Sequence, residues 1–154
     1  MKKFFSVLAL AIVVASCNKK EENKTTTTET DTVTTEIKTD RIVSLNGAVT
    51  ETLAALDVAG NIVGRDVTST YPADLKATDL GHVRSITAES ILALQPSVVF
   101  GTTKDVNPNL NEQLKKANIP LVLIDQEYSI EGSKKLITEV ATKLKKDNYQ
   151  PILD

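Results

Sequence analysis

Short apolar segments of β-strand composition alternate with segments of helical periodicity between residues 41 and 146, and this alternation restricts the fold most strongly. The strand segments are residues 41–45, 62–64, 97–100 and 120–124. The last of them is almost entirely apolar, as expected for a strand buried on both faces. Strands that alternate with helices form a parallel sheet through right-handed crossovers. The sequence therefore predicts an α/β fold, a single Rossmann-like lobe whose parallel sheet is flanked by helices.

The helical segments start at residues that suit a helix N-terminus. Asn46 precedes the first helix, which is expected to end near Gly60, and Thr87 precedes the second, expected over Ala88–Leu94. Asn107 is followed by Pro108, a residue favoured at the first helical position. Ser129 opens a longer helix. Its apolar face, at helical spacing, consists of Leu136, Ile137, Val140, Ala141 and Leu144.

Composition argues against several classes of function. The chain has 154 residues, is 41% hydrophobic and has a formal net charge of −2, which suits one modest domain with some additional sequence. The near-balanced charge and the absence of tryptophan argue against a nucleic-acid partner, so we expect none. Because there is a single cysteine, an internal disulfide is excluded.

Residues 1–16 have the organisation of a lipoprotein signal peptide. A basic start precedes an apolar run over residues 4–14, which is short for a membrane-spanning helix, and small residues then lead to Cys17. The order of residues 14–17 resembles a bacterial lipobox, which implies cleavage before Cys17 and lipidation of that residue. An ordinary buried cysteine is the alternative interpretation.

Residues 17–40 are predicted to combine the lipidated Cys17 with a disordered linker. From residue 23 to residue 40 the sequence is threonine-rich and polar. Such a composition cannot bury enough apolar surface to offset the entropy lost on ordering. Residues 18–22 resemble the surface-export signals of some lipoproteins, or form only the charged start of the tether.

Tyr71 and His82 are the candidate ligand-binding residues. Both lie in polar sequence after the strand at 62–64, in a loop expected at one end of the sheet, and His82 is the only histidine. Tyrosine and histidine side chains in such a loop are suitable ligands for haem iron. From the pattern alone, a packed turn tyrosine before Pro72 is the favoured interpretation of Tyr71. A surface-loop histidine is an equally good interpretation of His82.

Three longer stretches resemble a known family. They are RIVSLNGAVTETLAALDVAGNIVGRDVTSTYPADL, LGHVRSITAESILALQPSVVF and LNEQLKKANIPLVLID. Together they resemble the N-terminal lobe of haem-binding substrate-binding proteins, which are periplasmic binding proteins of the cobalamin and ferric-siderophore type. The segment GRDVTSTYP is the part most specific to the haem branch. Family members have two such lobes, joined by one long helix, that hold the ligand between them.

The resemblance implies roles for individual residues. Tyr71 falls where relatives place a tyrosinate on haem iron, a hard oxygen donor suited to the ferric state. His82 falls where some relatives use an axial histidine, which would bind as the neutral imidazole and be weakened by acid. Arg84 would meet a haem propionate, or is a solvated or salt-bridged loop residue. Glu89 resembles a glutamate that docks on the membrane permease, and it also suits a helix N-terminus.

The resemblance also implies an organisation for the chain. Residues 41–128 would form the N-terminal substrate-binding lobe, and residues 129–154 the start of the interlobe helix, with the second lobe absent. The protein would then be the N-terminal half of a lipid-anchored component of an ABC importer for haem. Its partners would be the permease and, through Cys17, a bacterial membrane, with the lobe on the periplasmic side or at the cell surface.

Three alternatives remain open. The ligand could instead be cobalamin or a ferric siderophore, although those ligands need aromatic walls or basic residues and this lobe has no tryptophan. An enzyme is not expected, because the sequence has neither a G-x-S-x-G elbow nor a Gly-rich phosphate loop. A non-functional truncated lobe is the third alternative, because an open half-cleft buries less ligand and exposes apolar surface.

Overall fold

The computed structural model describes residues 37–154. The strands are β1 (Ile42–Ser44), β2 (Ile62–Arg65), β3 (Thr78–Asp79), β4 (Val98–Thr102) and β5 (Leu121–Ile124). The helices are α1 (Gly47–Ala55), α2 (Ala88–Leu92), α3 (Pro108–Lys116), α4 (Ile130–Lys143) and α5 (Gln150–Leu153), with 3-10 helices at Ala59–Asn61 and Val83–Ser85. The predicted signal peptide, the lipidated Cys17 and the linker up to residue 36 lie outside the described residues.

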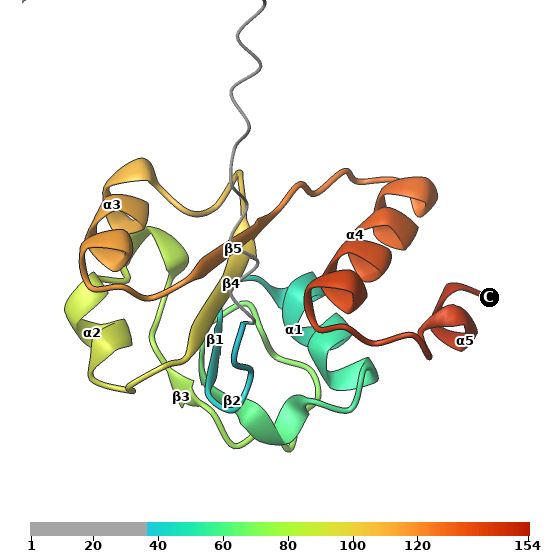
Figure 1. Cartoon of the computed structure of the whole chain (residues 1–154), viewed down its shortest axis with the longest axis horizontal. Helices are drawn as coiled ribbons and strands as arrows, with labels where there is room; N and C mark the ends of the chain where they lie inside the picture. The colour runs from blue at the N-terminus through green and yellow to red at the C-terminus, as the bar shows by residue number, and fades with distance from the viewer. Residues whose placement is uncertain (1–36) are drawn as a thin grey trace, which may run out of the picture. The chain divides into compact units, whose positions relative to one another are not determined.

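The five strands form one parallel sheet in the order β3-β2-β1-β4-β5 (Figure 1). This confirms the predicted α/β class and the parallel pairing. Strand β3 was not predicted, because it is only two residues long and both residues are polar and exposed. It pairs with the end of β2, where Gly64 and Arg65 lie opposite Thr78 and Asp79.

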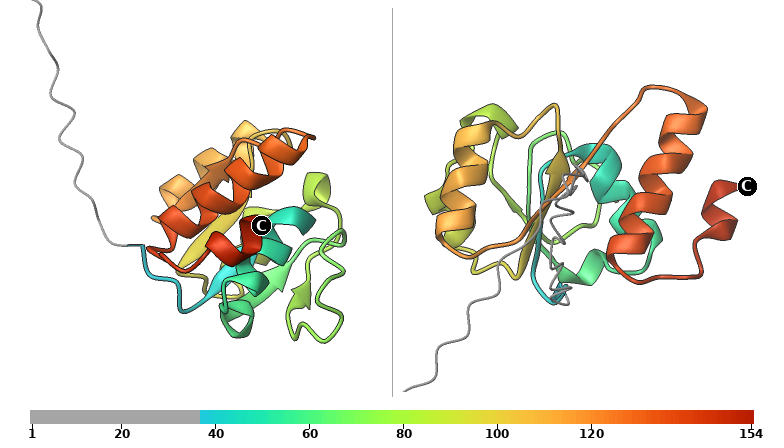
Figure 2. Two further views of the ribbon diagram at one scale, coloured as in Figure 1. Left: turned by 90° about the vertical axis from the view of Figure 1, so that its right-hand side faces the viewer. Right: turned by 45° about the horizontal axis from the view of Figure 1, so that its top comes forward.

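Helices cover both faces of the sheet. Figures 1 and 2 show α1 and α4 on one side and α2 and α3 on the other. Alternate residues of β1 separate accordingly, with Ile42 in the core beside α1 and α4 and Val43 in the core beside α2 and α3. The central strand β4 is buried along its whole length, as a strand covered on both faces must be.

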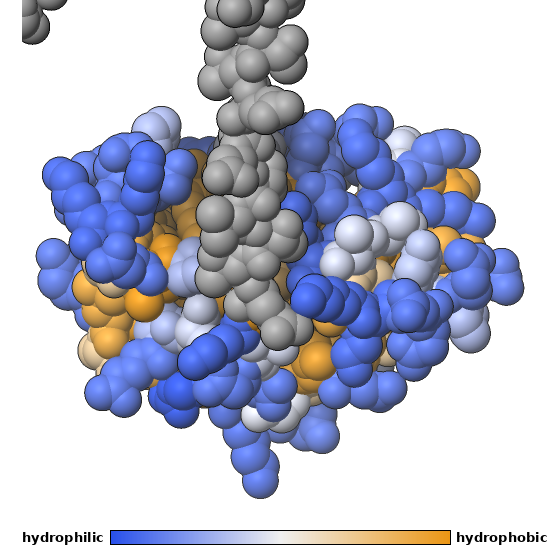
Figure 3. Space-filling view, in the orientation of Figure 1, coloured by the Kyte–Doolittle hydropathy of each residue, from blue (hydrophilic) through white to orange (hydrophobic). Residues whose placement is uncertain are grey.

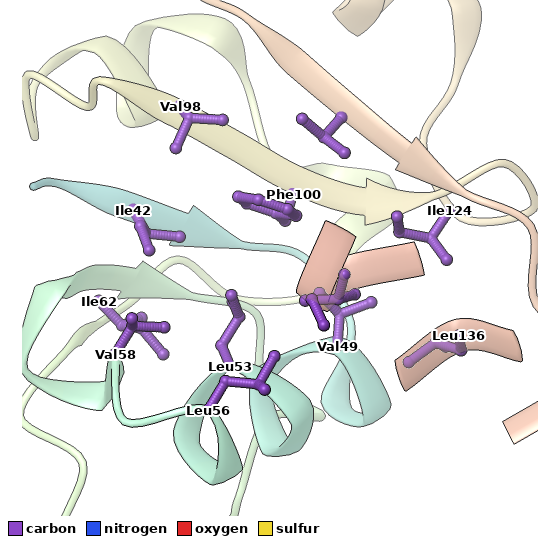
Figure 4. Packing of buried hydrophobic residues seen from close by; sticks show 13 residues of the cluster. Ile42, Val49, Leu53, Leu56, Val58, Ile62, Val98, Phe100, Ile124 and Leu136 are labelled. Carbon is purple, nitrogen blue, oxygen red and sulfur yellow. The ribbon is translucent and has the colours of Figure 1, made fainter. Parts of the chain in front are cut away.

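The larger of the two cores lies between the sheet and the α1–α4 layer (Figure 4). Leu53 points from α1 toward Phe100 of the sheet, and Leu136 of α4 lies on the same side. Leu56, directly after α1, belongs to the same core. Burying large aliphatic side chains stabilises a fold by roughly 1.5–3 kcal/mol each. Short α5 lies next to α4 (Figure 2) and adds the half-buried Ile152 to this core.

All four predicted helix caps are confirmed. The side chain of each residue accepts a hydrogen bond from a backbone N–H in the first turn: Asn46 from Val49 at 3.2 Å, Thr87 from Ser90 at 3.3 Å, Asn107 from Leu110 at 2.8 Å and Ser129 from Gly132 at 2.9 Å. Each bond satisfies an amide group that has no partner inside its helix.

Two helix ends differ from the predictions. The first helix ends at Ala55 rather than near Gly60, because Asp57 has a φ of 62° and residues 59–61 form a separate 3-10 turn. The second ends at Leu92 rather than Leu94, shortly before Gln95, whose φ is 49°. Left-handed residues of this kind commonly end helices, and local sequence marks them poorly when they are not glycine.

The surface seen in Figure 3 is mainly hydrophilic, with hydrophobic residues gathered in smaller areas. Among residues 37–154, no helix has both the length and the apolar character needed to cross a membrane.

Candidate functional site

The strand order reverses direction at β1, and this reversal locates a crevice. From β1 the chain moves outward through β2 and β3 on one side, and it then returns to place β4 and β5 on the other. Helix α1, which follows β1, lies on one face of the sheet, and α3, which follows β4, lies on the opposite face (Figures 1 and 2). Ligands of open α/β sheets bind at such a point, beyond the carboxyl ends of the strands.

Polar side chains join the loops at this crevice. The amide nitrogen of Asn46, after β1, donates to Asp105 Oδ2 at 2.8 Å and to Gln126 Oε1 at 3.3 Å. The hydroxyl of Thr102, at the end of β4, donates to the same Asp105 oxygen at 2.7 Å. The loops that follow β1, β4 and β5 are therefore held together by side chains from three separate parts of the chain.

Tyr71 lies on the rim of a groove between α1 and α4. The groove has a volume of about 380 Å³, and Tyr71 shares its lining with Ala48 and Glu51 of α1, Gln126 after β5, and Leu136 of α4. The residue is 63% exposed. The alternative interpretation, in which the ring of Tyr71 packs into the protein, therefore disagrees with the structure. Its phenol group faces solvent and the groove, where a ligand can reach it.

His82 is exposed and follows β3, the strand next to β2. Its Nδ1 accepts a hydrogen bond from the backbone N–H of Arg84 at 3.3 Å, which caps the 3-10 helix Val83–Ser85. Neutral imidazole has one acceptor nitrogen, so in this arrangement Nε2 carries the proton. Binding iron through Nε2 would therefore require His82 to release Arg84. The loops of Tyr71 and His82 touch, because Val67 N–H donates to the carbonyl of Gly81 at 2.8 Å.

Arg84 and Glu89 lie apart from the Tyr71 groove. They line a different hollow, on the α2–α3 side of the molecule, together with Asn107 and Gln113. Within residues 37–154, neither of the two ion pairs involves Arg84. The structure thus brings the Tyr71 and His82 loops into contact, and it groups Arg84 with Glu89 instead of with Tyr71.

Glu89 lies in the first turn of α2, as predicted for a carboxylate that suits a helix N-terminus. Two hydrogen bonds hold the pKa of Glu89 below its ordinary value of 4.5. The larger effect comes from a backbone N–H at this end of the helix, and the smaller from the Thr87 side chain. The side chain is exposed and remains accessible to a partner.

Sequence reasoning missed a set of buried polar residues beneath the Tyr71 loop. They are Ser44, Thr50, Asp66 and Ser69. Two of them lie inside GRDVTSTYP, but polar residues next to one another give no sign of burial. The described residues contain no group of three or more histidine, cysteine, aspartate or glutamate side chains placed to hold a metal ion.

Most of the described residues match a known protein family. The periplasmic binding protein family matches residues 42–148. This chain belongs to the periplasmic binding protein family. Members of the family are non-enzymatic transport components, which agrees with the expectation that the chain is not an enzyme.

Several solved structures similar to this family member are periplasmic haem-binding proteins. RhuT from Roseiflexus sp. RS-1, in its apo form, is 34% identical with a TM-score of 0.65, over 70% of this chain and 41% of that one. HutB of Vibrio cholerae is 28% identical with a TM-score of 0.69, over 75% and 46%. BhuT in complex with two hemes is 32% identical with a TM-score of 0.62, over 68% and 41%.

The comparison with curated proteins returned no match. The chain spans less than half the length of each of the three similar structures, so the similarity corresponds to one lobe of a binding protein.

Proposed function

We propose that this chain supplies the N-terminal lobe of the substrate-binding component of an ABC importer for haem, with Tyr71 as the axial ligand of ferric iron. The cargo brings its own porphyrin nitrogens, so the lobe needs to add only an axial donor and apolar contact area. A phenolate oxygen is a hard donor that favours the ferric state. Anchoring through lipidated Cys17 and docking of Glu89 on the permease belong to the same proposal.

The exposure of Tyr71 at the groove is the observation that supports this function best. Tyr71 belongs to a loop that follows the carboxyl end of β2, the end of a parallel strand near which ligands of this fold bind. It is exposed on the rim of the α1–α4 groove, where a ligand can reach it. The similarity to haem-binding proteins at 28–34% identity favours haem over other metal chelates. His82 lies on a neighbouring loop and is the second candidate ligand, at the expense of its bond to Arg84.

A haemin titration tests the proposal. Residues 18–154, which exclude the predicted signal peptide and Cys17, are titrated with haemin and followed by absorbance, beside the variants Tyr71→Phe, His82→Ala and Tyr128→Phe. Tyr128 is a matched control, because it is 84% exposed and lies on another loop, after β5. We expect a saturable Soret shift that Tyr71→Phe abolishes or alters and that Tyr128→Phe leaves unchanged.

Other results would lead to other conclusions. A non-saturating signal that is equal in all four proteins would exclude a haem site on this lobe and favour a non-functional lobe. A signal altered only in His82→Ala would transfer the ligand role to His82. Saturable binding of a cobalamin or a ferric siderophore, with none of haemin, would assign the lobe to another branch of the family.

The membrane and permease parts of the proposal have separate tests. In cells that express the full chain, Cys17→Ala should abolish incorporation of labelled fatty acid and release the protein from the membrane fraction. Glu89→Arg should reduce haemin uptake while haemin binding in solution is unchanged, because Glu89 lies away from the Tyr71 groove. Fatty-acid labelling that persists in Cys17→Ala would contradict the anchor.

A further inference from the structure

A buried carboxylate lies beneath the loop that carries Tyr71. Asp66, which directly follows β2, is 1% exposed. Its Oδ1 accepts a hydrogen bond from the Ser69 hydroxyl at 2.6 Å, and its Oδ2 accepts from the backbone N–H of Thr68 at 3.1 Å and from the Thr68 hydroxyl. One side chain thus closes the turn that leads directly to Tyr71.

A chain of hydroxyl groups continues from Asp66 into the centre of the fold. Ser69 Oγ lies 2.7 Å from Thr50 Oγ1, and Thr50 Oγ1 lies 2.7 Å from Ser44 Oγ. Ser44 belongs to the central strand β1 and Thr50 to α1, and all three hydroxyl-bearing residues are buried. The turn is therefore linked by hydrogen bonds to β1 and α1, and not only to its own strand.

Backbone contacts hold the same turn closely against its neighbours. The N–H of Asp66 donates to the carbonyl of Ser44 at 3.1 Å, and the N–H of Ser69 donates to the carbonyl of Asp66 at 3.2 Å. The start of α1 approaches the turn so nearly that a Cβ on Gly47 would lie 3.0 Å from the carbonyl oxygen of Thr68. The position at which the chain reaches Tyr71 is thus determined by β1, α1 and Asp66 together.

The buried Asp66 carboxylate is held by hydrogen bonds and not by an ion pair. Neither ion pair in residues 37–154 involves the Asp66 carboxylate, and the groups that donate to this carboxylate are neutral. The Arg65 guanidinium donates to the backbone carbonyl of Asp66, at 3.1 Å, and not to its side chain. Taking a carboxylate out of water is costly, and in some proteins a buried polar group serves to define one conformation of the chain. The conformation defined here is that of the turn before Tyr71.

We propose that Asp66 is a positioning residue for the ligand phenol: through Thr68 and through the Ser69–Thr50–Ser44 hydroxyl chain it holds Tyr71 on the rim of the groove. This inference rests on the proposed role of Tyr71 and deepens it. Asp66 does not touch the ligand. It restricts the Tyr71 loop to one position before the ligand binds. Binding then does not have to order the loop, and the affinity is higher.

The test compares variants that break the network with variants that preserve it. Asp66→Ala removes the acceptor, and Thr50→Val removes one hydroxyl with almost no change of shape, while Thr50→Ser keeps that hydroxyl. Asp74→Ala is the matched control, because Asp74 is an exposed aspartate of the same loop. Each protein is titrated with haemin, the absorption spectrum of the complex is recorded, and folding is checked by circular dichroism and thermal unfolding.

We expect Asp66→Ala to weaken haemin binding by about 10- to 100-fold, the usual effect of removing a group that orients a metal ligand. The spectrum of the remaining complex should shift toward that of Tyr71→Phe. Thr50→Val should act in the same direction, and Thr50→Ser and Asp74→Ala should match the wild type. A purely structural role would lower the unfolding temperature and leave the spectrum of the bound haem unchanged.

Amide hydrogen exchange supplies a readout without ligand. Asp66→Ala should accelerate exchange at Thr68, whose N–H loses its acceptor, and Asp74→Ala should not. If the wild type binds haemin and folded Asp66→Ala and Thr50→Val bind with its affinity and spectrum, the positioning role is wrong. If the wild type binds no haemin, the proposed function fails, and unchanged exchange at Thr68 in Asp66→Ala would then overturn the positioning role as well. If Asp66→Ala does not fold, the haemin affinity and spectrum of Thr50→Val, compared with those of Thr50→Ser, decide whether the positioning role holds.

Discussion

The side-chain amide of Asn46 donates to the carboxylate of Asp105 at 2.8 Å, which joins the loop after β1 to the loop after β4 at the crevice. The oxygen of the same amide accepts the N–H of Val49 at 3.2 Å and so caps α1. Asn46 therefore both starts the first helix and closes the point where the strand order reverses. A change at this residue affects a local and a long-range contact together.

Asn46→Ala should destabilise the lobe by about 1–3 kcal/mol, because it removes the cap of α1 and leaves the half-buried Asp105 with one donor fewer. Urea unfolding followed by circular dichroism measures the change. Asn109→Ala, at an exposed position of α3, is the control and should change the free energy of unfolding by less than about 0.5 kcal/mol. Equal stability of the two variants would mean that the Asn46 contacts contribute nothing.

Gly132→Ala should destabilise the lobe by about 1–3 kcal/mol. Gly132 is buried in the first turn of α4, and an added Cβ would lie 2.9 Å from the carbonyl carbon of Glu127 and closer still to its oxygen. Because the obstacle is the backbone and the Cβ of Glu127, no rotation of a side chain can relieve it. Gly60→Ala is the control, since a Cβ there would meet nothing within 4 Å. Thermal unfolding measures both variants. A lower unfolding temperature for Gly60→Ala than for Gly132→Ala would contradict this packing.

Leu53→Ala should cost about 2–5 kcal/mol, as expected when a fully buried leucine of the larger core is truncated. Leu53 points from α1 toward the sheet (Figure 4). Leu92→Ala is the comparison, because Leu92 is 36% exposed at the end of α2 and should lose much less. The two variants are measured by urea unfolding, and a similar loss in both would place Leu53 outside the cooperative core.

Glu89→Gln should reduce stability at neutral pH and have no effect in acid. The pKa of Glu89 is lower in the folded chain than its ordinary value of 4.5, so the ionised form stabilises the fold. This contribution is complete above pH 4.5 and is lost as the pH falls below it, through the pKa of the folded state. Unfolding of both proteins at neutral pH and at about pH 3 measures it. A difference that does not depend on pH would exclude this origin, and added salt should narrow the difference at neutral pH.

Local signals predicted much of this fold correctly. The caps Asn46, Thr87, Asn107 and Ser129 were all recognisable, because a cap depends on the side chain and the few residues that follow it. The strands β1, β2, β4 and β5 were recognisable because buried parallel strands are continuous apolar runs. Strand β3 was missed, since Thr78 and Asp79 pair only through their backbone at the edge of the sheet.

The candidate site was predicted in part. Tyr71 and His82 were expected on loops at one end of the sheet, and the structure has them after the neighbouring strands β2 and β3. The separation of Arg84 from the Tyr71 groove was not predicted, because it depends on which face of the sheet each loop turns toward. The predictions for Cys17, the signal peptide and most of the linker stay predictions, outside residues 37–154.

The sequence by itself determined the α/β class, the parallel sheet and the starts of the helices, because these depend on periodicity and on side chains within a few residues of one another. Only the tertiary structure decided that Asp66, Thr50 and Ser44 meet beneath the Tyr71 loop and that Asn46 reaches Asp105. These contacts join residues from different strands and loops. They form only when the sheet and its helices bring those residues together and remove water from the polar groups, which then have to bind one another.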